Sequence, residues 1–275
     1  MVVIKGKTCP KCGDKKFYRI RRGKKRCSKC NYETRKEPRI GNLNLSKREW
    51  ERIIFWFVLD QPILGIVEQT GLSRYSVSKA VYVLRQVMIL DVPGVFSGTV
   101  EVDETYLGGR KRNKRKSQLI KEKELFGKES KSGFGTTKQP VFGILCRSGK
   151  VWAEVVDKTE ARDLIPLITR QVERGTTVCS DTWRAYTGLA LRGYVHRLVK
   201  HREKEYVSKT DKKNHINGLE GFWGYLKRKL AAKGGVRRKH LHLFLGEYVW
   251  RYNHRGLEAN EKIDRLLNLV IKFSG

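Results

Sequence analysis

Apolar residues change their spacing along this chain, and the change predicts where a helical region gives way to strands. In residues 45–92 they recur at helical spacing, beginning with LSKREWERIIFWFVLD, in which Ser46 and Glu49 are spaced as a capping box. The next stretch, PILGIVEQTGLSRYSVSKAVYVLRQV, predicts two helices separated by the break TGLS. From residue 97, short strand-like runs alternate with helical ones, as in a sheet covered by helices.

This second region predicts the element order β-β-β-α-β-α-β-α, and therefore an α/β class with a mixed sheet and flanking helices. The predicted strands are GTVEVDETYL, the two halves of QPVFGILCRSGKVWAEVVD, GTTVCSD and YVHRLVK. The predicted helices are ARDLIPLITRQV, TWRAYTGLAL and KNHINGLEGFWGYLKRKL. A basic, Gly- and Lys-rich insertion at residues 108–138 separates the first two strands. We expect it to be a mobile loop, or one that DNA orders, and not part of the core.

Composition indicates the kind of partner. The 275 residues include 59 Lys and Arg against 28 Asp and Glu, which leaves a formal net charge of +31. A charge of this size predicts binding to a polyanion, of which nucleic acid is the commonest. The chain has no apolar run of about 18 residues, and the segment MVVIKGKTCP lacks an apolar signal core. We therefore expect no membrane partner and a cytoplasmic, nucleoid-associated protein.

Cysteine spacing predicts a metal site. Four of the six cysteines lie in the motifs CPKC and CSKC, with fourteen residues between the pairs: Cys9, Cys12, Cys27 and Cys30. Thiolates at this spacing can hold one tetrahedral Zn²⁺, whereas the alternative, two disulfides, is typical of secreted modules. The segment between the pairs is expected to be a β-hairpin that turns at Gly23 and is folded by the metal. Cys146 and Cys179 lie in apolar runs, and we expect them to be buried small hydrophobes.

These patterns divide the chain into four predicted domains. They are a zinc ribbon, a helix-turn-helix-like DNA-binding domain, an α/β domain and a C-terminal helical segment, at 1–38, 45–92, 97–233 and 234–275. The second helix of the helix-turn-helix would expose Arg74, Tyr75, Ser76 and Lys79. Paired helices with a glycine turn also occur in proteins that do not bind DNA, but the net charge favours DNA here.

The α/β domain carries three acidic positions of chemical interest. Asp103 lies at the end of the first strand, and Asp181 ends GTTVCSD, where it is alternatively the N-cap of the next helix. In KNHINGLEGFWGYLKRKL, Asn217, Glu220 and Lys227 share one helical face beside an apolar stripe. On its own, that face is equally typical of a solvated surface.

Together the acids predict a divalent metal site. Carboxylates held close together repel unless a cation lies between them, and Mg²⁺ or Mn²⁺ takes carboxylate oxygens together with substrate phosphate. Two such ions about 4 Å apart can activate an attacking oxygen and stabilise a leaving oxygen. Because strand side chains alternate, Glu101 lies on the same side as Asp103 and we expect it to play a supporting part, whereas Glu104 points the other way.

Three sequence blocks resemble a known family. VEVDETYLGGRKR, SDTWRAYTGL and HINGLEGFWGYLKR are similar to the signature blocks of insertion-sequence transposases with a DDE-type catalytic domain, especially the group with an N-terminal zinc ribbon. The resemblance covers nearly the whole chain, including YVWRYNHR in the last helical segment. It implies a ribonuclease-H-like fold, metal-dependent cleavage of transposon DNA ends, and strand transfer into target DNA.

The resemblance also implies roles for individual residues. Asp103 matches the first catalytic acid, Asp181 the second, Glu220 the third and Lys227 the basic residue that follows. Asp103 would bridge two Mg²⁺ or Mn²⁺ ions, Asp181 and Glu220 would each hold one, and Lys227 would contact a phosphate near the scissile bond. Members of this group can have Asn or His at the third position, so Asn217 and His215 are alternatives; the helical phase favours Asn217 over His215.

The implied partners are double-stranded DNA, in the form of terminal inverted repeats and target, and a second copy of the chain that pairs the two ends as a homodimer. Two other functions remain open from the sequence. The chain could be a zinc-ribbon and helix-turn-helix regulator without catalysis, or another metal-dependent nuclease on the same fold.

Overall fold

The computed structural model describes residues 8–20, 25–33, 43–109, 114–126, 136–181, 186, 188–199 and 215–274. The chain forms two compact units, Met1–Val83 with Ile263–Gly275, and Leu84–Lys262. The finer division into four domains remains a prediction. In the part of the chain that the structure describes, no helix is both long and apolar enough to cross a membrane.

The cysteine-containing segment is a small two-stranded sheet. Strands β1 (Phe17–Arg19) and β2 (Lys25–Cys27) are antiparallel, with Phe17 opposite Cys27. The predicted hairpin strands are thus confirmed, while its turn at Gly23 lies outside the described residues. Among its described residues, the apolar cluster consists of Phe17 and the cysteines with Tyr32 beside them. So small a cluster cannot stabilise a fold alone, and a metal ion bound by the cysteines would supply the missing stability.

The helical region forms as the apolar spacing predicts. Its helices are α1 (Lys47–Val58), α2 (Ile63–Thr70), α3 (Arg74–Leu90) and, from the end of the chain, α8 (Ala259–Ser274). The capping box is present, because the Glu49 N–H donates to Ser46 Oγ and the Ser46 N–H donates to the Glu49 carboxylate. Gly71 ends α2 in the left-handed region at φ 67°, so the chain turns within three residues into α3.

The second unit is built on one mixed sheet. Its strands are β3 (Thr99–Leu107), β4 (Gln139–Cys146), β5 (Val151–Val155), β6 (Thr177–Asp181) and β7 (Val195–Val199). The spatial order is β5-β4-β3-β6-β7, in which β4 is antiparallel to both of its neighbours, and β3, β6 and β7 are parallel. This is the mixed sheet predicted for a ribonuclease-H-like fold.

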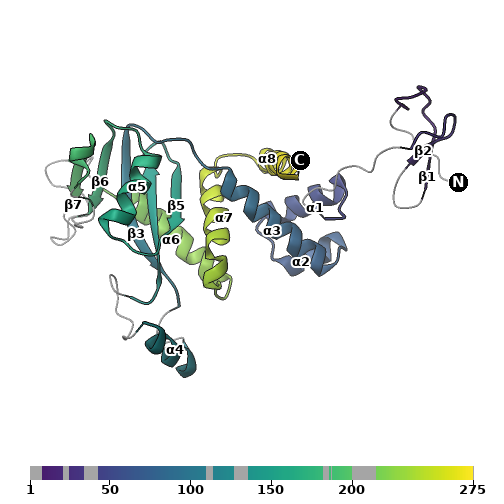
Figure 1. The fold of residues 1–275 in the computed structure, drawn as a ribbon. Coiled ribbons are helices and arrows are strands. Elements are labelled where there is room, and N and C mark those ends of the chain that lie inside the picture. The colour runs from purple at the N-terminus through teal and green to yellow at the C-terminus, as the bar shows by residue number, and fades with distance from the viewer. Residues whose placement is uncertain are drawn as a thin grey trace. The chain divides into compact units, whose positions relative to one another are not determined.

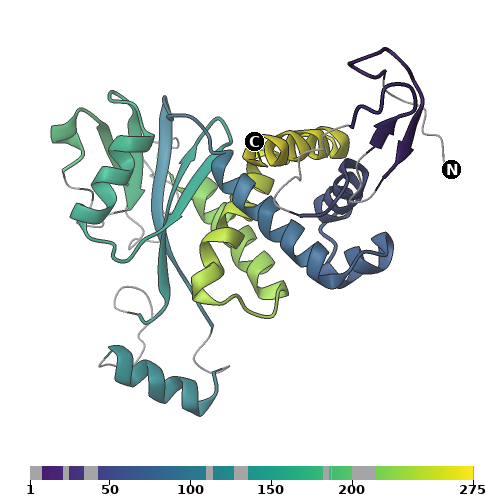
Figure 2. The same ribbon diagram turned by 45° about the vertical axis from the view of Figure 1, so that its right-hand side comes forward.

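Helices cover both faces of this sheet (Figures 1 and 2). They are α5 (Ala161–Gln171) on one face and α6 (Asn217–Ala232) with α7 (Leu241–Asn253) on the other, with short 3-10 turns at Ala190–Arg192 and Arg238–His240. Helix α4 (Lys116–Phe126) lies apart from the sheet in both views (Figures 1 and 2). One core joins α5 to the face formed by residues such as Val100 and Val102. A second core packs α6 and α7 on the opposite face, around Trp223 and Tyr248. Alternate residues of β3 therefore meet different helices.

The described residues correct several sequence predictions. Asp103 lies in the middle of β3 and not at the end of its strand, because pairing with β4 continues to Leu107. The insertion contains the helix α4, because KSQLIKEKELF consists almost entirely of strong helix formers; residues 110–113 and 127–135 lie outside the description. Of the helix predicted over TWRAYTGLAL, the described residues form no α-helix; Ala190–Arg192 is a 3-10 turn that ends at Gly193 in the left-handed region at φ 84°. Residues 182–185 and 187 of that block are outside the described part.

Candidate active site and zinc site

The sheet brings the two candidate aspartates to neighbouring positions. In the parallel pair β3 and β6, Glu101 is opposite Cys179, so Asp103 and Asp181 each lie two residues further along their strands. The side-chain period of two directs both toward the same face of the sheet. Asp181 is the last residue of β6, where it pairs with Val199 of β7. The topology therefore places the two carboxylates together, although 78 residues of sequence (181 − 103) separate them.

Helix α6 lies against Asp103 and carries the third candidate acid. The indole Nε1 of Trp223 donates a hydrogen bond of 3.0 Å to Asp103. Beneath the indole is Gly143 of β4, opposite Asp103 in the sheet, and a Cβ there would lie only 2.6 Å from the Trp223 ring. The glycine thus allows α6 to approach the sheet closely. Asn217 and Glu220 lie in the first turn of this helix, and both are exposed.

The electrostatics of Asp103 reflect this crowding. Burial raises its pKa to about 7, with further contributions from the negative charges of Asp181 and Glu220, while the hydrogen bond from Trp223 opposes the shift. Asp103 thus lies within electrostatic range of both other acids. Repulsion of this kind is relieved by a cation, and the oxygen donors suit Mg²⁺ or Mn²⁺. Among the described residues, however, the four cysteines of the ribbon are the one group of metal-ligating side chains gathered closely enough to hold an ion as they stand.

Glu104 lies on the opposite side of β3, as the alternation predicts, and its side chain is partly buried against Tyr186. Tyr186, which is fully buried, donates its hydroxyl to the Glu104 carboxylate. Burial raises the pKa of Glu104 to about 8, and the charges of Asp103 and Asp181 add to the effect.

Lys227 lies two turns after Glu220 on α6, where its side chain is exposed but partly covered by its neighbours. Burial lowers its pKa, the charge of Asp103 opposes that shift, and the nearby ammonium of Lys138 adds to it. Neither lysine forms an ion pair with another described residue. Two cations beside the acids form a suitable surface for a DNA phosphate.

His215 contacts Glu101 and none of the candidate metal ligands in the described contacts. Its Nδ1 lies 3.2 Å from the carboxylate of Glu101, which is itself 1% exposed and accepts the Leu219 N–H. Arg147 also reaches Glu101, at 3.4 Å. Glu101 thus lies on the Asp103 side of β3, as predicted, and contacts the start of α6.

Sequence reasoning missed several of these contacts. The helical spacing places Trp223 in the apolar stripe of KNHINGLEGFWGYLKRKL but does not show its bond to Asp103, and no pattern marks Arg147 or Tyr186 as a partner of an acid. One signal could have indicated the contact of Trp223. Gly143 is a small residue in a strand of large apolar residues, which is typical of a close approach by another part of the chain. No comparable pattern marks the other two.

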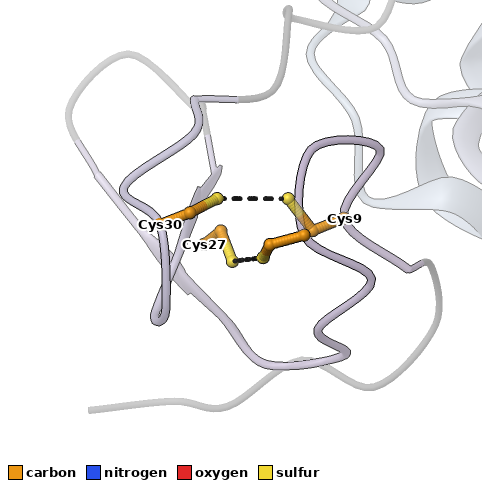
Figure 3. Close-up of side chains that lie close together, drawn as sticks. Cys9, Cys27 and Cys30 are labelled. Atoms are coloured by element: carbon orange, nitrogen blue, oxygen red, sulfur yellow. Dashed lines mark hydrogen bonds between the residues drawn. The ribbon is translucent and has the colours of Figure 1, made fainter.

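The four ribbon cysteines form a compact sulfur cluster (Figure 3). Their Sγ atoms all lie within 4.8 Å of one another, with Cys9 and Cys30 at 3.5 Å and Cys12 and Cys27 also at 3.5 Å. A tetrahedral Zn²⁺ with bonds of about 2.3 Å separates its sulfurs by slightly less than 4 Å, so the donor set fits zinc. All six cysteines are free, with Cys146 and Cys179 buried as predicted.

The sheet and its helices place the second unit in the ribonuclease-H-like class. The chain belongs to the family of ISXO2-like transposase domains, whose model matches residues 95–253. An uncharacterized transposase-like protein of Haemophilus influenzae is 31% identical over 121 residues, which are 44% of this chain and 94% of that protein. The expected transposase family is thus confirmed.

Among solved structures, a chain of the simian T-cell lymphotropic virus intasome in complex with the PP2A regulatory subunit B56 gamma is similar at 9% identity. The match covers 74% of this chain and 68% of the viral structure's chain, with a TM-score of 0.35. A similarity this low supports neither the fold nor the function.

Proposed function

We propose that this transposase cleaves transposon DNA ends and joins the freed 3′-hydroxyl to target DNA, using Asp103, Asp181 and Glu220 to hold two Mg²⁺ or Mn²⁺ ions. The observation that supports this most strongly is the environment of Asp103, whose pKa of about 7 reflects burial together with the charges of both other acids. Holding acids of like charge close together destabilises a fold, so their proximity favours a role in binding cations.

The proposed roles follow from position. When bound, the metal ions would activate the attacking oxygen and stabilise the leaving oxygen of an in-line displacement. Asp103, oriented by Trp223, would hold these ions together with Asp181 from β6 and Glu220 from α6. Lys227 would hold a phosphate near the scissile bond, and Lys138 is close enough to share that charge.

The third metal ligand is proposed to be Glu220, with Asn217 as the alternative on the same exposed face. A carboxylate binds Mg²⁺ more strongly than an amide, and the charge of Glu220 acts on Asp103. Glu220→Gln and Asn217→Ala separate the two: loss of cleavage in the first alone supports Glu220, and loss in the second alone supports Asn217.

DNA binding is proposed for the N-terminal part of the chain. In α3, Tyr75 is 69% exposed and Lys79 extends over its ring at 5.7 Å, which leaves a cationic and aromatic surface after the turn at Gly71. Such a surface suits the groove and backbone of double-stranded DNA at a terminal repeat. Pairing of two ends would require a homodimer, and the substrate would lie in the nucleoid.

The decisive assay incubates the purified chain with transposon-end DNA and Mg²⁺ or Mn²⁺. Wild type should nick the end and join it to target, and Asp103→Ala and Asp181→Ala should do neither. Asp157→Ala is the matched control, because Asp157 is an exposed aspartate that follows β5. The proposal fails if wild type is inactive or if the alanine variants cleave equally well. Binding without cleavage would favour a regulator, and RNA cleavage alone would favour another nuclease.

A further inference from the structure

The start of helix α6 is held by a carboxylate from the sheet. The first N–H groups of a helix have no partner within the helix, and an N-cap side chain usually accepts one of them. Here the N-cap residue is Ile216, which has no side-chain oxygen and makes no such bond. Glu101 of β3 takes its place, since its Oε2 accepts the Leu219 N–H at 2.9 Å. Its negative charge also lies where the helix dipole favours an anion.

The backbone is adapted to this contact. A Cβ at Gly218 would lie 2.9 Å from Glu101 Oε2 and 3.1 Å from a Leu145 methyl group. With any larger residue at 218, either the carboxylate or the helix would therefore have to shift. The close approach of α6 to the sheet depends on glycine here, as it does at Gly143 under Trp223.

Arg147 completes the link from the end of β4. Its guanidinium lies 3.4 Å from Glu101 Oε1 and donates to the His215 carbonyl at 3.0 Å. Its backbone N–H also donates to the Thr99 carbonyl in β3. Because Glu101 is 1% exposed, its charge needs a partner such as Arg147. The same arginine also holds the backbone of His215, which directly precedes the N-cap of α6.

We propose that Glu101 and Arg147 are positioning residues that set the first turn of α6, and hence Asn217 and Glu220, relative to Asp103. The inference rests on the proposed function of these acids. Glu101 precedes Asp103 by two residues on one face of β3, so a single strand carries the first acid and anchors the helix that carries the third. A shift of this helix would separate Glu220 from Asp103 without unfolding the sheet.

The test uses the full chain with Glu101→Ala, Glu101→Gln and Arg147→Met. Glu247→Gln is the matched control, because Glu247 is also 1% exposed and bridges two arginines, Arg85 at 2.7 Å and Arg251 at 3.0 Å, but lies in α7. For each variant one measures the single-turnover cleavage rate at saturating metal and DNA, DNA affinity without divalent metal, and amide hydrogen exchange over residues 217–222.

Glu101→Ala should slow cleavage about 10- to 100-fold, the usual effect of removing a group that orients metal ligands. Its DNA affinity should be unchanged, and exchange should accelerate in the first turn of α6. Glu101→Gln retains an acceptor for the Leu219 N–H and should recover part of the rate, while Arg147→Met should resemble Glu101→Ala. Glu247→Gln should change neither the rate nor the exchange of α6.

The inference is overturned if folded Glu101→Ala cleaves at the wild-type rate, or if Glu247→Gln slows cleavage equally, since that would indicate general destabilisation. If wild type itself fails to cleave, the proposed function fails, and amide exchange alone decides the positioning role. Faster exchange confined to the first turn of α6 in Glu101→Ala then supports it, and unchanged exchange rejects it.

Discussion

The indole nitrogen of Trp223 donates a 3.0 Å hydrogen bond to Asp103, which ties α6 directly to the first candidate acid. Trp223→Phe keeps a large ring but removes this donor, so Asp103 loses its orientation. Cleavage should slow by about 10- to 100-fold, as for other groups that orient metal ligands. Trp152→Phe makes the same change in a buried tryptophan of the opposite core and should leave the rate unchanged. Equal rates for the two variants would contradict the role given to Trp223.

The raised pKa values predict a dependence of stability on pH. The pKa of Asp103 is about 7 and that of Glu104 about 8 in the folded chain, whereas both groups ionise near pH 4 when unfolded. Between these values the folded state binds more protons, so their contribution to the free energy of unfolding falls as pH rises from about 4 to about 8.

Asp103→Asn replaces the carboxyl group by an amide that does not ionise, so the contribution of residue 103 to the free energy of unfolding no longer falls as pH rises. In buffer without added Mg²⁺ or Mn²⁺, the variant should therefore gain melting temperature over wild type at pH 8, and the gain should shrink toward pH 5. The full shift corresponds to an upper limit of about 4 kcal/mol. Asp157→Asn, the exposed control, should show no such trend. A gain that is constant with pH would show that Asp103 has an ordinary pKa.

Metal content tests the ribbon. Because the four thiols are gathered within 4.8 Å, metal analysis should find about one zinc per chain. Cys27→Ala should lose it and unfold the ribbon, since the small cluster around Phe17 cannot replace the metal. Cys146→Ala changes a buried cysteine outside the ribbon and should retain the zinc. Purified wild type without zinc would exclude the ribbon as a zinc site.

Salt dependence tests the DNA surface of α3. If Lys79 neutralises one phosphate, Lys79→Ala should reduce the slope of log affinity against log salt by about 0.9. Arg162→Ala is the control, because Arg162 is exposed on α5 and paired with Glu160 at 2.8 Å. Its slope should equal that of wild type. An unchanged slope in Lys79→Ala would remove this residue from the interface.

The sequence predicted the strands and helices well where local spacing determines them. The capping box at Ser46 and the alternation that separates Glu101 from Glu104 both follow from periods of the backbone itself. It could not predict that the indole of Trp223 donates to Asp103, because an apolar stripe shows which residues face inward but not which atom each one meets. Nor could it pair Glu101 with Arg147, since 46 residues separate them and only the register of β3 with β4 brings them together.

The edge of the sheet at β5 has a consequence for solubility. Asn253, the last residue of α7, accepts the Val151 N–H at 2.7 Å and donates to the Val151 carbonyl at 2.8 Å. These are the outward backbone groups that a strand from another molecule would pair with, and open edges of this kind promote aggregation. The side-chain amide thus acts as a one-residue substitute for a neighbouring strand. Loss of α7 would expose the unpaired backbone groups of β5 and so create a site for aggregation through strand pairing.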